Sequence, residues 1–181
     1  MEEIEEIDFS AEYRPQIQVE EPWLPKDLWS EILPGLWVGG CSDSDTIEGV
    51  LKGEIKPKPL SKEQFDTVVT LYSFANPCDW LVKELRYGYY DAPTMQGIDM
   101  ATIDQIVDIA HADWKAGKKV LFRCAAGLNR SSLCAALCII KSGATPDEAI
   151  NLIRAKRSKW ALFNRTFEAY LHTQGRVNKA S

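Results

Sequence analysis

The chain has 181 residues, of which 45% are hydrophobic and 26% charged, as in an ordinary globular protein. A chain of this length buries enough surface to fold without disulfide or metal staples, so disulfide scaffolds and low-complexity classes are excluded. No run of 18 apolar residues occurs, and the first ten residues, MEEIEEIDFS, are acidic. We therefore expect a cytoplasmic protein that has no membrane span.

The net charge of −5 is unevenly distributed. Residues 1–21 carry eight acidic side chains against Arg14 alone, whereas the rest of the chain carries 18 acidic and 20 basic residues. We predict an acidic, poorly ordered or loosely packed tail over residues 1–28, one folded domain over 29–175 and a short tail over 176–181. The domain is only mildly basic, so no nucleic-acid partner is favoured, and we expect a monomer.

Cysteine and histidine usage limits the chemistry further. The five cysteines include no C-x-x-C pair, and the two histidines, His111 and His172, lie far apart in the sequence. This pattern fits reduced thiols better than a disulfide framework and argues against a histidine metal site. We expect neither a metal nor another cofactor.

The first half of the chain predicts two or three strands. The segment ILPGLWVGG, from Ile32, reads as a strand or hairpin that ends in a glycine pair. Apolar spacing predicts a helix over residues 45–51, and two prolines and four lysines predict a surface loop over 52–64. The β-branched run FDTVVTL predicts a buried strand over 65–71, and a second strand is expected around Tyr87–Tyr90.

The second half has a clearer helical pattern. Asp99 is the expected N-cap of an amphipathic helix that ends before Gly117, and the sequence TPDE from Thr145 has capping-box spacing. We predict a strand over 119–122, a buried helix over the run SSLCAALCII, a helix to about Arg157 and a last helix over about 161–172. Alternating strands and helices indicate an α/β domain with a central, mostly parallel sheet flanked by helices.

The segment KKVLFRCAAGLNRSS carries the chemistry. It places a strand, then Cys124, five residues, Arg130 and Ser131, and then a helix. The Cys-x5-Arg spacing alone is a weak signal, but Gly127 and the hydroxyl residue after Arg130 make it specific. A loop that runs into a helix N-terminus gathers N–H groups into an anion site, where a cysteine favours the thiolate. Arg130 can hold two phosphoryl oxygens at once, and Gly127 permits a left-handed turn.

With these residues the segment resembles the signature of the cysteine-dependent protein tyrosine phosphatase superfamily, specifically its small dual-specificity branch. The likeness extends from about Ile32 to Leu171, because ILPGLWVGG is similar to the first strands of that branch and the segments RAKR and NRTFEAYL are similar to its closing helices. The resemblance implies a phosphatase-like fold and hydrolysis of phosphotyrosine, and also of phosphoserine and phosphothreonine, in proteins.

The resemblance also implies a role for each site residue. Cys124 would be the nucleophile of a metal-independent, two-step reaction with a phosphocysteine intermediate, Arg130 the phosphate clamp, and Ser131 the hydroxyl that helps the thiolate leave. Asp91, in YYDAPT, would be the general acid that protonates the leaving oxygen; Asp99 is the rival, better explained as a helix cap. The phosphate cradle would be the backbone of Ala125, Ala126, Gly127, Leu128 and Asn129.

One residue departs from the pattern, because the family usually has histidine where Arg123 precedes the nucleophile. Arg123 either supplies a positive charge to the sulfur or points into solvent, and repulsion from Arg130 favours solvent. The departure leaves a catalytically poor phosphate-binding module as one alternative function. Similarity of the GLNR stretch to RNA 5′-triphosphatases gives another.

The remaining cysteines and basic residues receive structural interpretations. Cys134 and Cys138 are expected to be core residues, and Cys41 or Cys78 is a candidate resolving thiol under oxidation. We expect the basic group Arg154, Lys156, Arg157 and Lys159 to form a solvated face. No aromatic loop precedes the first strands, which favours a shallow site.

Overall fold

A computed structural model describes residues 24–42, 46 and 58–177. Its five-stranded sheet has the order β1-β2-β5-β3-β4. The β1–β2 pair is antiparallel and the other neighbouring pairs are parallel, which confirms the mostly parallel sheet. The strands are β1 (Trp29–Leu33), β2 (Leu36–Gly39), β3 (Thr67–Thr70), β4 (Lys83–Arg86) and β5 (Val120–Arg123).

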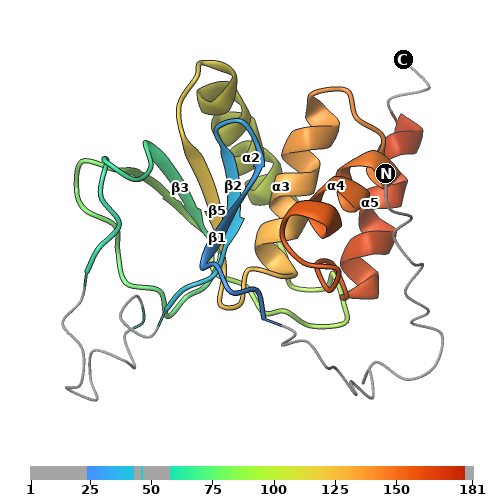
Figure 1. The fold of residues 1–181 in the computed structure, drawn as a ribbon. Coiled ribbons are helices and arrows are strands. Elements are labelled where there is room, and N and C mark those ends of the chain that lie inside the picture. The colour runs from blue at the N-terminus through green and yellow to red at the C-terminus, as the bar shows by residue number, and fades with distance from the viewer. Residues whose placement is uncertain (1–23, 43–45, 47–57, 178–181) are drawn as a thin grey trace.

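Four helices lie within the described part of the chain: α2 (Met100–Lys115), α3 (Arg130–Lys141), α4 (Pro146–Lys156) and α5 (Arg165–Val177). Helices α3, α4 and α5 stand side by side next to the sheet (Figure 1). One hydrophobic core joins these helices and α2 to the sheet. The predicted single α/β domain is confirmed, and no described helix is both long and apolar enough to cross a membrane.

Local sequence signals explain why the elements begin where they do. The Asp99 carboxylate accepts the N–H groups of Ala101 and Thr102 at the start of α2, so its predicted role as N-cap is confirmed. At the start of α4, Thr145 and Glu148 form the predicted capping box. The ILPGLWVGG segment forms most of the β1–β2 hairpin, which turns at Gly35 with φ of +80°.

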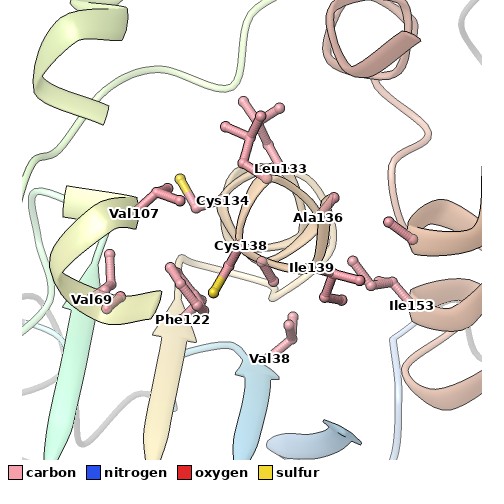
Figure 2. Packing of buried hydrophobic residues seen from close by; sticks show 14 of the residues in the cluster. Val38, Val69, Val107, Phe122, Leu133, Cys134, Ala136, Cys138, Ile139 and Ile153 are labelled. Carbon is pink, nitrogen blue, oxygen red and sulfur yellow. The ribbon is translucent and has the colours of Figure 1, made fainter. Parts of the chain in front are cut away.

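Helix α3 is the centre of the core. Every residue from Arg130 to Ile140 is buried, and after the polar first turn the sequence LCAALCII is apolar on all sides, as expected of a buried helix. Figure 2 shows this helix end-on, with Cys134 beside Val107 of α2 and Cys138 on the side of the sheet. Burial raises the pKa of both thiols to about 12, so they stay protonated and serve as core residues, as predicted.

The opposite face of the sheet carries a second, smaller core. Its buried members are Leu60, Phe65, Val68, Val82 and Leu121, with Trp29 and Trp37 packed against them. The segment between β3 and β4 and the residues before β3 contribute to this layer instead of a helix. The two faces therefore divide the side chains of β5, because Leu121 belongs to one core and Phe122 to the other.

One predicted strand is wrong, and one predicted helix lies almost entirely outside the described residues. The strand expected at Tyr87–Tyr90 is wrong: the edge strand is Lys83–Arg86, whose polar sequence KELR lacks the β-branched signal. Tyr87 and Tyr89 instead turn toward α2 and α3: the Tyr87 hydroxyl accepts the Asp99 N–H at 2.7 Å, and the Tyr89 hydroxyl contacts the Arg130 carbonyl. The helix predicted over residues 45–51 lies outside the described residues except for Thr46, as do residues 52–57 of the predicted 52–64 loop.

Candidate active site

The turn between β5 and α3 encloses the sulfur of Cys124. Cys124 is 2% exposed, and its Sγ accepts the Gly127 N–H at 3.3 Å. The Ser131 hydroxyl lies 3.3 Å from the same sulfur, on the first turn of α3. The Gly127 N–H, the Ser131 hydroxyl and the N-terminus of α3 thus converge on one sulfur atom.

Four successive carbonyl groups of this turn point away from the sulfur. Arg157 donates to the oxygens of Ala126 and Gly127, and backbone N–H groups hold the carbonyls on either side. Those flanking bonds are Cys41 N–H to Ala125 O at 2.9 Å and Leu162 N–H to Leu128 O at 2.9 Å. Because C=O and N–H of a trans peptide point in opposite directions, the N–H groups of residues 126–129 face the inside of the turn. Such a ring of N–H groups binds anions.

Arg157 is the main external support of the turn. It is 7% exposed and donates its remaining hydrogen bonds to the Asp27 carbonyl and the Ser30 hydroxyl. Burial lowers the pKa of its guanidinium to about 10, which still leaves it charged at neutral pH. The expectation that the basic group around α4 is a solvated face is therefore wrong for Arg157, and Arg154 pairs with Glu168.

Glycines allow the turn to lie directly against β2. Gly127 has φ of +73°, the left-handed conformation predicted for it, and a Cβ there would collide with Gly39 and lie 2.6 Å from Gly40 N. A Cβ at Gly40 would lie 2.6 Å from Ala125 O. Gly40 is thus needed for close packing against the turn, whereas a Cβ at Gly39 would meet Trp29 and the Leu28 carbonyl on the β1 side.

Arg130 lines a pocket of about 390 Å³ beside the turn. Its Nη1 donates to the Tyr89 carbonyl at 2.8 Å, and its guanidinium lies 5.3 Å from the centre of the Tyr72 ring. Among the residues that the structure describes, the buried Arg130 Nε finds no hydrogen-bond acceptor, so one donor is left for a ligand. The aromatic lining is Tyr72, Phe74, Tyr89 and Tyr90.

The prediction of a shallow site assumed that aromatic residues would have to precede the first strands. The structure brings them from elsewhere, since Tyr72 and Phe74 follow β3 while Tyr89 and Tyr90 follow β4. Tyr90 is 86% exposed and Phe74 53% exposed, so both rings stand at the rim. The pocket therefore has aromatic walls above a cationic base.

Asp91 is joined to the turn through two buried asparagines. Its carboxylate oxygens accept hydrogen bonds from Asn129 Nδ2 and Asn164 Nδ2, each at 2.8 Å. Asn129 Oδ1 in turn accepts the Asn164 N–H at 3.0 Å. This places Asp91 at the edge of the turn, whereas Asp99 is committed to its cap.

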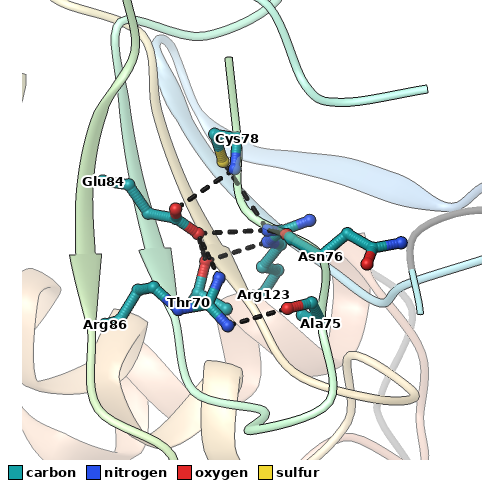
Figure 3. A network of polar contacts seen from close by, with 7 residues as sticks. All are labelled: Thr70, Ala75, Asn76, Cys78, Glu84, Arg86 and Arg123. Carbon is teal, nitrogen blue, oxygen red and sulfur yellow. Dashed lines mark hydrogen bonds and ion pairs between the residues drawn. The ribbon is translucent and has the colours of Figure 1, made fainter. Parts of the chain in front are cut away.

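Arg123 takes neither of the orientations considered from the sequence. It is 2% exposed, so the preference for solvent is wrong, and its side chain lies on the side of the sheet occupied by the smaller core. There its guanidinium pairs with Glu84 at 3.2 Å and its Nε donates to the Thr70 hydroxyl at 2.9 Å (Figure 3). Glu84 is thus a buried acidic partner for Arg123 that neither predicted orientation included.

Sequence reasoning missed the supporting residues Arg157 and Asn164. Both belong to the segments RAKR and NRTFEAYL, which carried the resemblance without an assigned role. Their bonds reach Gly127 and Asn129, 30 and 35 residues earlier in the chain. A buried polar residue with such distant partners leaves no local pattern in the sequence.

Comparison with known proteins identifies the fold. Neither a family model nor the sequence of a curated protein matches the chain. Human DUSP28 is similar in structure, with a TM-score of 0.68, 17% identity, and coverage of 87% of this chain and 99% of that chain.

Two further structures give the same result. The human tyrosine phosphatase-like serine/threonine/tyrosine-interacting protein has a TM-score of 0.63 and 20% identity, over 83% of this chain and 97% of that chain. Tk-PTP in the active form has a TM-score of 0.62 and 18% identity, over 84% and 99%. The resemblance seen in the sequence is thereby confirmed at the level of the fold: the chain has the fold of the small dual-specificity and tyrosine phosphatases.

Proposed function

We propose that this protein is a metal-independent phosphatase that hydrolyses phosphotyrosine in proteins through a phosphocysteine intermediate. The observation that carries the proposal is the position of Cys124 Sγ, which accepts hydrogen bonds inside an anion-binding turn beside the open donor of Arg130. A thiolate, a ring of N–H groups and a guanidinium around one point are suited to a phosphoryl group that is attacked by sulfur.

In the first step, the Cys124 thiolate attacks phosphorus and the bond from phosphorus to the substrate oxygen breaks. The N–H groups of Ala125 to Asn129 and the Arg130 guanidinium hold the three equatorial oxygens, where negative charge is spread in the transition state. Asp91 gives its proton to the leaving phenolate. One of its two amide contacts must open to free the oxygen that carries the proton.

In the second step, a water molecule attacks phosphorus and the S–P bond breaks, which releases phosphate and restores the thiolate. Asp91, now ionised, takes the proton of the attacking water. The Ser131 hydroxyl donates to the departing sulfur from its position 3.3 Å away. Both steps of the proposed reaction thus use only Cys124, Arg130, Ser131, Asp91 and the backbone of the turn, without a metal ion.

The aromatic walls of the pocket favour phosphotyrosine over the aliphatic phosphoresidues. Tyr72, Phe74 and Tyr90 line the pocket and give an aryl group aromatic neighbours, and a phenolate is also a better leaving group than an alkoxide. We expect phosphotyrosine peptides to exceed phosphothreonine peptides in kcat/KM, with both above RNA 5′-triphosphate.

Turnover of p-nitrophenyl phosphate in excess chelator is the direct test. Hydrolysis should persist in the chelator, be inhibited by vanadate and disappear in Cys124→Ser. Cys138→Ala is the matched control, because this thiol lies in the core and should leave turnover intact. Retained activity in Cys124→Ser would overturn the mechanism, and absence of turnover in the wild type would leave only a phosphate-binding module. Ranking RNA 5′-triphosphate first in a substrate panel would overturn the protein-phosphatase assignment alone.

A further inference from the structure

A buried ionic cluster lies behind the candidate site, on the opposite side of the sheet from the helices. The Glu84 carboxylate contacts both Arg123 and Arg86, and accepts the Thr70 hydroxyl at 2.7 Å and the Cys78 N–H at 3.1 Å (Figure 3). Burial alone would raise the pKa of Glu84, but these hydrogen bonds and the two arginines lower it below its ordinary value. Glu84 is therefore ionised at neutral pH.

The cluster holds one segment in particular, residues 75–78. Arg86 Nη2 donates to the Ala75 carbonyl at 2.7 Å, and Arg123 Nη2 donates to the Asn76 carbonyl at 2.7 Å and lies 3.6 Å from Cys78 Sγ. Burial raises the pKa of Cys78 to about 12, so it is a neutral thiol here. A segment without regular secondary structure is thus fixed by charged hydrogen bonds, which are among the stronger ones in proteins.

The same segment continues directly from the wall of the pocket. Leu71 is hydrogen-bonded to β5 and to α3. Its N–H donates to the Arg123 carbonyl, and its own carbonyl accepts Arg130 Nη1. Tyr72 and Phe74, whose rings lie 5.6 Å apart, line the pocket immediately before Ala75. The wall is therefore anchored at one end by β5 and Arg130 and at the other by the cluster.

We propose that Arg123 is a positioning residue that fixes the aromatic wall formed by Tyr72 and Phe74, and so sets the affinity for the aryl group of the substrate. This inference rests on the proposed function. Arg123 reaches the end of β3, the 75–78 segment and β4 with one planar fork, which lysine cannot reproduce. It acts on the wall rather than on the sulfur, because its side chain and Cys124 lie on opposite sides of β5.

Because residue 123 is an arginine, its hold on the wall formed by Tyr72 and Phe74 should not depend on pH. A guanidinium stays charged throughout the accessible range, whereas an imidazole loses its charge near pH 6.5. The charged and titratable groups that face it are Glu84 and Arg86 of β4 and the Cys78 thiol. An Arg123→His variant would pair with Glu84 only while its imidazole is protonated, so the wall should loosen as the pH rises through neutrality.

Steady-state kinetics of Arg123→Lys separate the wall from the turn. We expect KM for a phosphotyrosine peptide to rise at least about fivefold, while the inhibition constant of vanadate, which binds the turn alone, changes less than about twofold. For Arg123→His, the ratio of its KM to that of the wild type should rise between pH 6 and 8. The corresponding ratio of the vanadate inhibition constants should not change. Lys83→Ala is the control, because this neighbour on β4 pairs with Asp113 instead of the cluster.

Hydrogen exchange gives a readout that needs no turnover. Amides of residues 72–78 should exchange faster in Arg123→Lys, with α3 unchanged. Glu84→Gln keeps the shape of the cluster without its charge and should show the same exchange if the arginine variant does not fold. Equal shifts of KM and the vanadate constant, or unchanged exchange at 72–78, would overturn the inference. Failure of the proposed function is distinct, because it would appear as absence of Cys124-dependent turnover in the wild type.

Discussion

Arg157 Nε donates a hydrogen bond to the Gly127 carbonyl oxygen at 3.1 Å, which joins the end of α4 to the turn between β5 and α3. Replacing Arg157 by methionine should remove this bond and those to Ala126, Asp27 and Ser30, with a loss of about 2–3 kcal/mol in the free energy of unfolding. Turnover should fall more than tenfold, because the freed carbonyls no longer fix the inward N–H groups. Urea unfolding and kcat measure the two effects. Lys156→Met, an exposed change on the same helix, should alter neither quantity.

Gly127→Ala tests the close packing of the turn against β2. The left-handed φ costs about 1–2 kcal/mol for alanine, and the collision of the added Cβ with Gly39 brings the expected loss to about 3–5 kcal/mol. Gly117→Ala is a matched control, because Gly117 has φ of +83° with nothing within 4 Å of an added Cβ. Thermal unfolding of both variants should show the larger loss at Gly127. Equal losses in the two variants would contradict the expected collision of the added Cβ with Gly39.

Asp91→Asn tests the general acid. If Asp91 protonates the leaving oxygen, the rate should fall about 10²–10³-fold for a substrate with a poor leaving group and far less for p-nitrophenyl phosphate. Asp99→Ala, which removes only a helix cap, should lower stability with no dependence on the leaving group. An equal fall for both substrates in Asp91→Asn would instead assign Asp91 to holding Asn129 and the turn.

We expect Asp113 to make the free energy of unfolding depend on pH between about 4 and 2. Burial alone would raise its pKa, but hydrogen bonds from Lys118, Lys83 and Thr67 lower it from 3.8 to about 2. Because the folded pKa is below the unfolded one, the contribution is present above about pH 4 and is lost as the pH falls toward 2. Urea midpoints of Asp113→Asn should be lower at neutral pH and flatter between pH 4 and 2. Asp108→Asn, which removes an exposed pair with Lys141, should keep the wild-type slope.

Elements with local signals could be predicted from the sequence. Asp99 and Thr145 cap α2 and α4 through bonds to residues two or three positions away, and β5 and α3 enclose the motif that identifies the turn. The left-handed Gly127 was also predicted, because the turn has to fold over itself. In each case the signal that predicts the feature lies within one short segment of the sequence.

Residues with distant partners could not be predicted. Arg157 bonds to Asp27, 130 residues earlier, and Arg123 bonds to Glu84, 39 residues earlier, so neither looks different from a surface arginine in the sequence. The position of the edge strand β4 was predicted wrongly, because its sequence KELR forms ion pairs and lacks residues of high β propensity. The aromatic pocket was missed because its two halves follow different strands.

The dependence of the turn on Arg157 and Asn164 sets an order of events during synthesis. The ribosome makes Cys124 33 residues before Arg157 and 40 residues before Asn164, the two side chains that support its turn. A nascent chain therefore carries Cys124 without the bonds to Gly127 and Asn129, and domains generally fold as units once their chain is available. The turn gains these bonds only when α4 and the start of α5 have been made, so the sulfur that we propose as the nucleophile is fully enclosed only when the domain is almost complete.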